Sequence, residues 1–173
     1  ARDRLRAAGT GDVLAIQADL TDPDEVTALV EETVDSFGGL DHLVTSAGGP
    51  PSGRFGDVND GDWYRAYDLL VMSVVWTIRE AEPHLRAGNG GTITAITSRT
   101  VRQVIDTLVL SNAVRRAVTG LIQSLARDFA PEVRANAVLP GAHETGRIEE
   151  LVRDSVERGD VPDYETGLAA WAD

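Results

Sequence analysis

The stretch around which the rest of the chain can be ordered is Gly91-Thr92-Ile93-Thr94-Ala95-Ile96-Thr97-Ser98. The turn signal Gly-Asn-Gly-Gly at 88–91 comes before a predicted strand at 92–97, which ends at Ser98. Apolar residues at helical spacing follow over 108–130, and Pro131 ends that helix before another predicted strand at 133–139. This succession of strand, helix and strand is typical of a parallel sheet.

The same alternation extends in both directions along the chain. We expect, in order, the tail of a helix at 1–8, a buried strand at 13–18, a helix after Thr21 or Asp22 as N-cap, a strand at 40–45, a long helix at 62–85, and a helical, acidic last stretch at 145–173 with a break at Gly159-Asp160-Val161-Pro162. The long helix is apolar nearly all round, so its own sheet and a second subunit are both expected to cover it.

These elements predict one fold class. Strands and helices that alternate throughout indicate an α/β protein with a doubly wound, Rossmann-type parallel sheet and helices on both faces. In such folds the ligand binds beyond the carboxyl ends of the strands. The length of 173 residues fits one domain with a single core.

Composition narrows the classes of function. The net charge of -12 and the pI near 4.6 argue against a nucleic-acid binder, because phosphate backbones require a basic face. Cysteine is absent and His42, His84 and His143 are scattered, so we expect no metal site. The sequence contains no run of about 18 apolar residues and no apolar signal segment, so we expect a cytoplasmic protein without membrane contact.

The basic residues include no lysine. An acidic excess without lysine suits a salt-adapted cytoplasm, where carboxylates hold a hydration layer and charge repulsion is screened. A GC-rich genome would also favour arginine over lysine. The composition is compatible with both explanations.

Four segments, in order and at compatible spacing, resemble the short-chain dehydrogenase/reductase family. They are Asp19-Leu20, Thr45-Ser46-Ala47-Gly48, Gly91 to Ser98, and Asn136-Ala137-Val138-Leu139-Pro140-Gly141 with Thr145. The resemblance covers nearly the whole chain and implies a nicotinamide cofactor, NAD or NADP, with a carbonyl or alcohol compound as substrate. The cofactor-binding residues that it implies are Asp19 and Leu20 at the adenine, Ala47 and Gly48 along the cofactor, Arg115 at the ribose, and Pro140, Gly141 and Thr145 at the nicotinamide.

Each segment also has a plainer explanation. An aspartate after a strand is commonly a helix N-cap, a role that Asp19 would share with its neighbours. Ala47-Gly48 and Pro140-Gly141 are ordinary turns when taken alone, although small residues also let the backbone approach a ligand. The order of the segments along the chain is what favours the cofactor role.

The resemblance also implies that part of the domain lies outside this chain. The family's sheet order is 3-2-1-4-5-6-7, and the four predicted strands correspond to the third through the sixth. Gly9-Thr10-Gly11 lacks the third glycine of a dinucleotide loop, because position 14 is Leu14. We therefore expect residues 1–173 to be a partial single domain without the first two strand-helix units and the last strand. A gap is then expected between the strands at 13–18 and 40–45.

In this family a tyrosine exchanges a proton with the substrate oxygen, and a lysine four residues later holds the nicotinamide ribose. A serine orients the substrate, and an asparagine supports a proton relay. The matching positions hold Ser98 for the serine, Ser111 for the tyrosine, Arg115 for the lysine and Leu70 for the asparagine. The resemblance thus gives Ser98, Ser111 and Arg115 as the catalytic set. Arg115 keeps a permanent cation and a donor fork that suits ribose hydroxyls.

The proton donor is open, because a serine hydroxyl is a far weaker acid than tyrosine. Candidate substitutes are Arg99, Arg102, Asp106, His143 and Tyr164, each of which is also explained as an ordinary surface residue. The pattern Ser-Asn-x-x-Arg at 111–115 resembles a divergent branch of the family that is commonly labelled 3-oxoacyl-carrier-protein reductase.

Two hypotheses for the function follow. The first is an NAD(P)-dependent oxidoreductase with a rearranged proton donor, and Ser98, Arg115 and the loop from Pro140 to Thr145 favour it. The second is a catalytically silent nucleotide-binding or scaffolding protein, which Leu70 and Ser111 favour. In either case we expect a homo-oligomer formed through the helices at 62–85 and 108–130.

Overall fold

The computed structural model describes residues 2–9, 11–88, 90–143 and 145–172. Its elements are α1 (Arg2–Ala8), α2 (Pro23–Phe37), β1 (His42–Thr45), η1 (Phe55–Asp57), α3 (Asp60–Tyr67), η2 (Asp68–Met72), α4 (Ser73–Ala87), β2 (Gly91–Ile96), η3 (Arg99–Val101), α5 (Val109–Asp128), β3 (Val133–Val138), α6 (Gly146–Glu157) and α7 (Tyr164–Ala172). The residues outside the description include parts of predicted turns and helices, namely Ala1, Thr10, Asn89, Glu144 and Asp173. No described helix has both the length and the apolar composition that a bilayer crossing requires.

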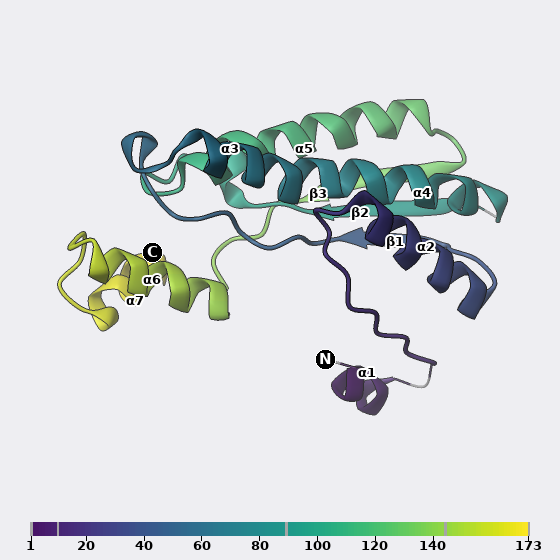
Figure 1. The fold of residues 1–173 in the computed structure, drawn as a ribbon, viewed down its shortest axis with the longest axis horizontal. Helices are drawn as coiled ribbons and strands as arrows, with labels where there is room; N and C mark the ends of the chain where they lie inside the picture. The colour runs from purple at the N-terminus through teal and green to yellow at the C-terminus, as the bar shows by residue number, and fades with distance from the viewer. Residues whose placement is uncertain (1, 10, 89, 144, 173) are drawn as a thin grey trace.

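Three parallel strands form the sheet, in the order β1-β2-β3 (Figure 1). Val44 of β1 pairs with Thr94 of β2, and Thr94 pairs with Asn136 of β3, so equivalent positions lie in rows across the sheet. The three strands predicted from residue 40 onward are therefore confirmed, with slightly different ends. The α/β class with a parallel sheet is confirmed with them.

Helices cover one face of this sheet. In Figure 1, α4 and α5 lie on the same side of the strands, and α2 packs against α4. Right-handed crossovers explain the arrangement, because the strand order β1-β2-β3 never reverses and each crossover then returns over the same face. The predicted helices on both faces are thus not found in the part of the chain that the structure describes.

The burial of the strands follows this one-sided cover. Ile93 and Ala95 of β2 and Val133 of β3 point into the buried core that α4 and α5 complete. On the opposite face, Val44 is 63% exposed and Val138 is 45% exposed. Since successive strand residues point to opposite faces, these exposed valines lie on the face of the sheet that α4 and α5 leave uncovered.

The predicted strand at 13–18 does not form. Residues 12–19 have no regular structure, and their apolar side chains are exposed or half-buried. A strand needs a neighbour to satisfy its backbone N–H and C=O groups, and no described strand pairs with this segment. Because no strand forms at 13–18, the expected gap between it and the strand at 40–45 stays a prediction.

Helix α2 begins as the sequence predicts. Asp22 is the N-cap, its carboxylate accepts a hydrogen bond from the backbone N–H of Asp24, and Pro23 occupies the first helical position. Thr21, the other predicted cap, instead donates to the carboxylate of Asp19. Gly38 ends the helix with φ of 80°, a left-handed conformation that glycine adopts without strain.

The long helix predicted at 62–85 consists of α3, η2 and α4 in direct succession. It begins at the N-cap Asn59, where a reciprocal capping box joins Asn59 and Asp62. The middle segment η2 is a π-helix, which the apolar pattern does not reveal. Leu70 lies in this segment and is only 2% exposed, so it belongs to the core.

Candidate functional site

A cavity of about 510 Å³ lies at the carboxyl ends of the three strands. Its walls come from the loops that follow β1, β2 and β3, from the N-terminal half of α5, and from α6 and α7. Of the predicted site residues, the cavity brings together Ala47, Gly48, Ser98, Ser111, Arg115, Pro140, Gly141 and Thr145. This volume and position are typical of a small-molecule site in an α/β protein.

Asp19 and Leu20 do not line this cavity. The carboxylate of Asp19 accepts hydrogen bonds from the backbone N–H of Thr21 at 2.8 Å and from its hydroxyl at 2.7 Å. These bonds lower the pKa of the Asp19 carboxyl. In the described structure this residue therefore organises the turn before α2, and its adenine contact stays a prediction.

Ser98 follows β2 directly and is the N-cap of the short helix η3. Its Oγ accepts the backbone N–H of Thr100 at 3.2 Å. That bond uses the oxygen as an acceptor and leaves the O–H of Ser98 available to donate into the cavity. The residue can thus orient an oxygen atom of a ligand.

Ser111 lies in the first turn of α5 and is buried. Its hydroxyl oxygen lies 3.2 Å from the hydroxyl oxygen of Thr100, and Thr100 also donates to the carbonyl of Ser111 at 3.4 Å. The two hydroxyls satisfy each other inside the protein. Ser111 therefore ties α5 to η3 in addition to lining the cavity.

Arg115 lies one turn further along α5, with its guanidinium between two strand ends. It donates to the carbonyl of Thr97 at 3.2 Å and to the carbonyl of Gly48 at 3.1 Å, while its Nε is buried without a hydrogen-bond partner among the described residues. Burial lowers the pKa of Arg115, and the nearby positive charge of Arg147 lowers it further. The side chain remains a cation, because arginine titrates far above neutral pH.

The loop after β1 is held from several sides. Gly53 donates its backbone N–H to the carbonyl of Thr107 and accepts the N–H of Val109, so the loop is fixed to the start of α5. On the other side Arg147 of α6 donates to the carbonyl of Pro50, and a side chain at Gly49 would collide with the Arg147 guanidinium. Glycine at position 49 therefore lets Arg147 pack directly on the loop.

Arg147 is a cavity residue that the sequence interpretation missed. It lies in the first turn of α6, where the helix dipole disfavours a cation. A basic residue directly after Thr145-Gly146 therefore indicates, from the sequence alone, that the side chain interacts with something other than its own helix. Trp171 of α7 was missed as well. The guanidinium carbon of Arg99 lies over its ring, 5.5 Å from the ring centroid.

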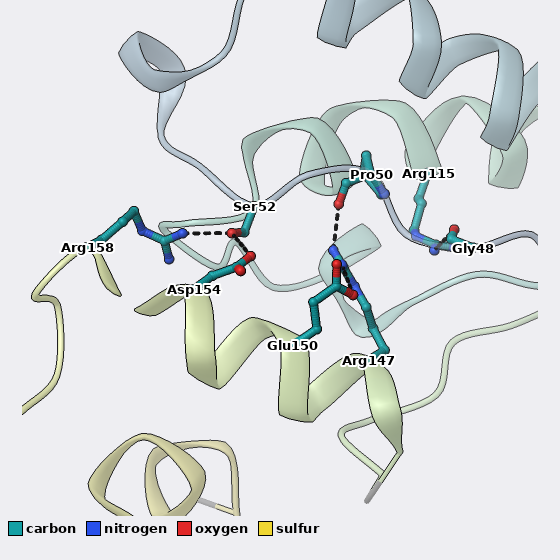
Figure 2. Close-up of polar contacts among 8 residues, drawn as sticks. All are labelled: Gly48, Pro50, Ser52, Arg115, Arg147, Glu150, Asp154 and Arg158. Carbon is teal, nitrogen blue, oxygen red and sulfur yellow. Dashed lines mark hydrogen bonds and ion pairs between the residues drawn. The ribbon is translucent and has the colours of Figure 1, made fainter. Parts of the chain in front are cut away.

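A polar cluster joins the same loop to the far end of α6, as Figure 2 shows. The hydroxyl of Ser52 donates to Asp154 at 2.7 Å and accepts from Arg158 at 2.7 Å. Arg158 also pairs with Asp160, which in turn pairs with Arg54 at 3.5 Å. These contacts hold the C-terminal end of α6 and the residues that follow it against the loop after β1.

The proposed substitutes for the missing tyrosine separate into two groups. Arg99 and His143 line the cavity, whereas Arg102, Asp106 and Tyr164 do not. Leu70, at the asparagine position, is buried in the core and offers no polar group. Of the candidate substitutes, Arg99 and His143 therefore lie where a ligand in the cavity could meet them, and a role in proton exchange stays a prediction.

Comparison with known proteins gives the family. Residues 2–160 match a family model described as enoyl-(acyl carrier protein) reductase. The chain belongs to the short-chain dehydrogenase/reductase family. Its relatives include versicolorin reductase of Emericella nidulans, 31% identical over 172 residues, which are 98% of this chain and 64% of that protein. The chain thus spans less than two thirds of the length of this relative.

Solved structures of the same family have the same fold. The aldohexose dehydrogenase of Thermoplasma acidophilum has a TM-score of 0.81 at 25% identity, over 94% of this chain and 62% of that one. A 7α-hydroxysteroid dehydrogenase complexed with NADH and 7-oxo glycochenodeoxycholic acid has a TM-score of 0.76 at 28% identity, over 87% of this chain and 62% of that one. A further related structure has NADP bound. Members of the family therefore bind NAD or NADP cofactors.

Proposed function

We propose that the protein is an NAD(P)-dependent oxidoreductase that interconverts a carbonyl and an alcohol, with a proton donor other than tyrosine. The observation that supports the proposal most is the convergence of Ser98, Arg115 and the loop from Pro140 to Thr145 on one cavity. These residues come from the segment after β2, from α5 and from the segment after β3, and packing of a core alone does not require them to meet there.

The cavity fits a nicotinamide ring and its ribose. A methyl group added at Gly48 or Gly141 would meet no atom within 4 Å, so both glycines face open space beside the strand ends. Arg115 uses two of its five N–H groups on carbonyls, and the others can donate to ribose hydroxyls. When bound, the nicotinamide supplies or accepts a hydride at the substrate carbon, and the substrate oxygen gains or loses a proton.

The residues of this chain have separate tasks in that reaction. The Ser98 hydroxyl donates to the substrate oxygen and so stabilises negative charge on it as the carbonyl is reduced. Arg115 holds the ribose and adds positive charge near the reacting atoms. Ser111 does not exchange the proton, because its hydroxyl is a very weak acid and is engaged with Thr100. The proton comes from His143 or from a water molecule held by Ser98.

The alternative is a catalytically silent nucleotide-binding or scaffolding protein. One observation favours it, since Leu70 is packed in the core at the position of the relay asparagine. Both hypotheses predict the same cavity, and they differ in whether the protein converts a substrate.

Calorimetry on the full-length protein tests the proposal. We expect NADH or NADPH to bind in the micromolar range, about -8 kcal/mol, with slow reduction of simple ketones. If a cofactor binds but no ketone in a panel is reduced, the catalytically silent alternative is supported instead. Absence of binding for both cofactors would overturn the oxidoreductase proposal.

A further inference from the structure

Two arginines from different helices converge on the same cavity. Arg115 reaches it from α5 and Arg147 from α6, and both donate to the loop at Gly48–Pro50 between them (Figure 2). Their charges are compensated to different degrees. Arg147 pairs with Glu150 at 2.7 Å, whose side chain is 61% exposed, and no carboxylate among the described residues pairs with Arg115.

Both guanidinium groups retain donors. Each has five N–H groups, and the structure assigns two bonds to each, to Thr97 and Gly48 for Arg115 and to Pro50 and Glu150 for Arg147. The Nε of Arg115 is buried and unpartnered among the described residues. Because this Nε has almost no accessible surface, the donors of Arg115 left for a ligand are the remaining N–H groups of Nη1 and Nη2.

The electrostatics of the cavity differ from those of the chain as a whole. The chain has a net charge of -12, whereas the charged residues described in the lining are Arg99, Arg115, Arg147 and Glu150. Burial lowers the pKa of Arg115, and the positive charge of the nearby Arg147 lowers it further, as expected for two cations that repel each other. An anion between them would relieve this repulsion, and the positive lining would select anions against the acidic surroundings.

We propose that Arg115 and Arg147 form a subsite for an anionic oxygen group, a carboxylate or a phosphate, on the ligand that fills the cavity. Guanidinium groups suit this chemistry, because their planar donor forks match both anions in bidentate geometry. The inference rests on the proposed function for the identity of the ligand, since the group belongs either to the substrate or to the diphosphate of the cofactor.

Inorganic phosphate is the probe for the first test, titrated by calorimetry into the full-length protein. Arg147→Gln should weaken phosphate binding about tenfold, as expected for the loss of one charged, hydrogen-bonded donor group. Arg153→Gln is the matched control, because it removes an exposed positive charge from the same helix. Equal binding by the wild type and both variants would overturn the subsite.

A second pair of variants separates anion binding from support of the loop, since Arg147 also holds Pro50. Glu150→Gln removes the counter-charge of Arg147 and should strengthen phosphate binding about threefold. Glu149→Gln removes an exposed carboxylate that faces Arg153 and should leave binding unchanged. If Arg147→Gln weakens binding while Glu150→Gln has no effect, Arg147 acts only through the loop and the subsite is overturned.

The source of the anion follows from repeating the titration with NADH present. Phosphate that still binds the NADH-loaded protein assigns the subsite to an acidic group of the substrate, and phosphate that is displaced assigns it to the cofactor diphosphate. Both outcomes support the subsite. NADH binding is measured separately, so Arg147-dependent phosphate binding without NADH binding would preserve the subsite and overturn the oxidoreductase proposal instead.

Discussion

Replacing Arg115 tests the proposed contact between this side chain and the ribose of the cofactor. Its guanidinium bridges the carbonyls of Thr97 and Gly48 at the ends of two strands, next to the proposed ribose site. Arg115→Ala should weaken NADH or NADPH binding by about tenfold or more, because the lost donors are charged. Ser111→Ala should leave the dissociation constant nearly unchanged, since that hydroxyl is engaged with Thr100.

Calorimetry of the two variants beside the wild type measures this difference. Circular dichroism is the control for folding, because Arg115 also connects β1 and β2. Equal losses of affinity in both variants would contradict the assignment of the ribose contact to Arg115.

The hydroxyl pair of Ser111 and Thr100 should contribute to stability. Both residues are buried, so removing one hydroxyl leaves the other with fewer partners. Ser111→Ala should lower the free energy of unfolding by about 1 kcal/mol. Ser124→Ala removes an exposed hydroxyl from the same helix and should change stability by less than about 0.5 kcal/mol. Urea unfolding of both variants checks the prediction, and equal effects would speak against it.

At the residue scale, eight of the ten site residues predicted from the sequence line the cavity. Ser98, Ser111 and Arg115 meet there because each follows a strand end or lies near the start of α5. Arg147 could not be placed from its spacing, since its reach into the cavity depends on how α6 turns back toward the loop at Gly49. The engagement of Ser111 with Thr100 was likewise invisible, because η3 is too short to leave a pattern.

At the scale of elements, the start of α3 should respond to pH through Asp62. The backbone N–H of Asn59 donates to this carboxylate at 2.9 Å and lowers the pKa of Asp62, with a further contribution from Arg65. A lowered folded-state pKa stabilises the protein above the ordinary aspartate range, and this stabilisation is lost as the pH falls through the folded value. Wild type should therefore have a higher Tm than Asp62→Ala at about pH 7, and the difference should be smaller at a pH well below the ordinary aspartate range. A difference in Tm that is the same at both pH values would disprove this account of the cap.

The attachment of α6 and α7 to the loop after β1 should be weak enough to detect by hydrogen exchange. Arg158 connects Ser52 to Asp160, and pairs of this exposure contribute about 0.2–1 kcal/mol. Arg158→Ala should speed amide exchange in α6 about twofold to fivefold by allowing more frequent opening.

Arg153→Ala is the matched control for this variant, because Arg153 pairs only within α6 at 3.6 Å from Glu149 among the described residues. Exchange should also become faster in the wild type at high salt, which screens the cluster. Unchanged exchange in Arg158→Ala would show that apolar packing alone holds the two helices.

Elements with an apolar pattern and a neighbouring strand or helix were predicted correctly, whereas a predicted strand without a partner among the described strands was not. The strands at 42–45, 91–96 and 133–138 support one another across the sheet. The segment at 13–18 has the composition of a strand, yet composition cannot supply a hydrogen-bonding partner. The π-helix at 68–72 escaped prediction because it shifts the helical phase by a fraction of a turn within an apolar run.

At the scale of the whole molecule, we predict a homo-oligomer formed through α4 and α5. Met72 and Trp76 lie one helical turn apart, are half-buried and fall outside the buried core, so they are available for a second subunit. Light scattering should give a mass of at least two subunits for the full-length protein, and Trp76→Glu should reduce it. A monomer at working salt would contradict the prediction.

The strand order has a consequence for how the chain is made. Each strand pairs with the one that precedes it in the sequence, β2 with β1 and β3 with β2, and helices lie between the two strands of each pair. During synthesis on the ribosome, every strand therefore emerges after the neighbour that it needs. The sheet can grow one strand at a time at the tunnel exit without waiting for sequence beyond the newest strand, so its assembly should keep pace with translation.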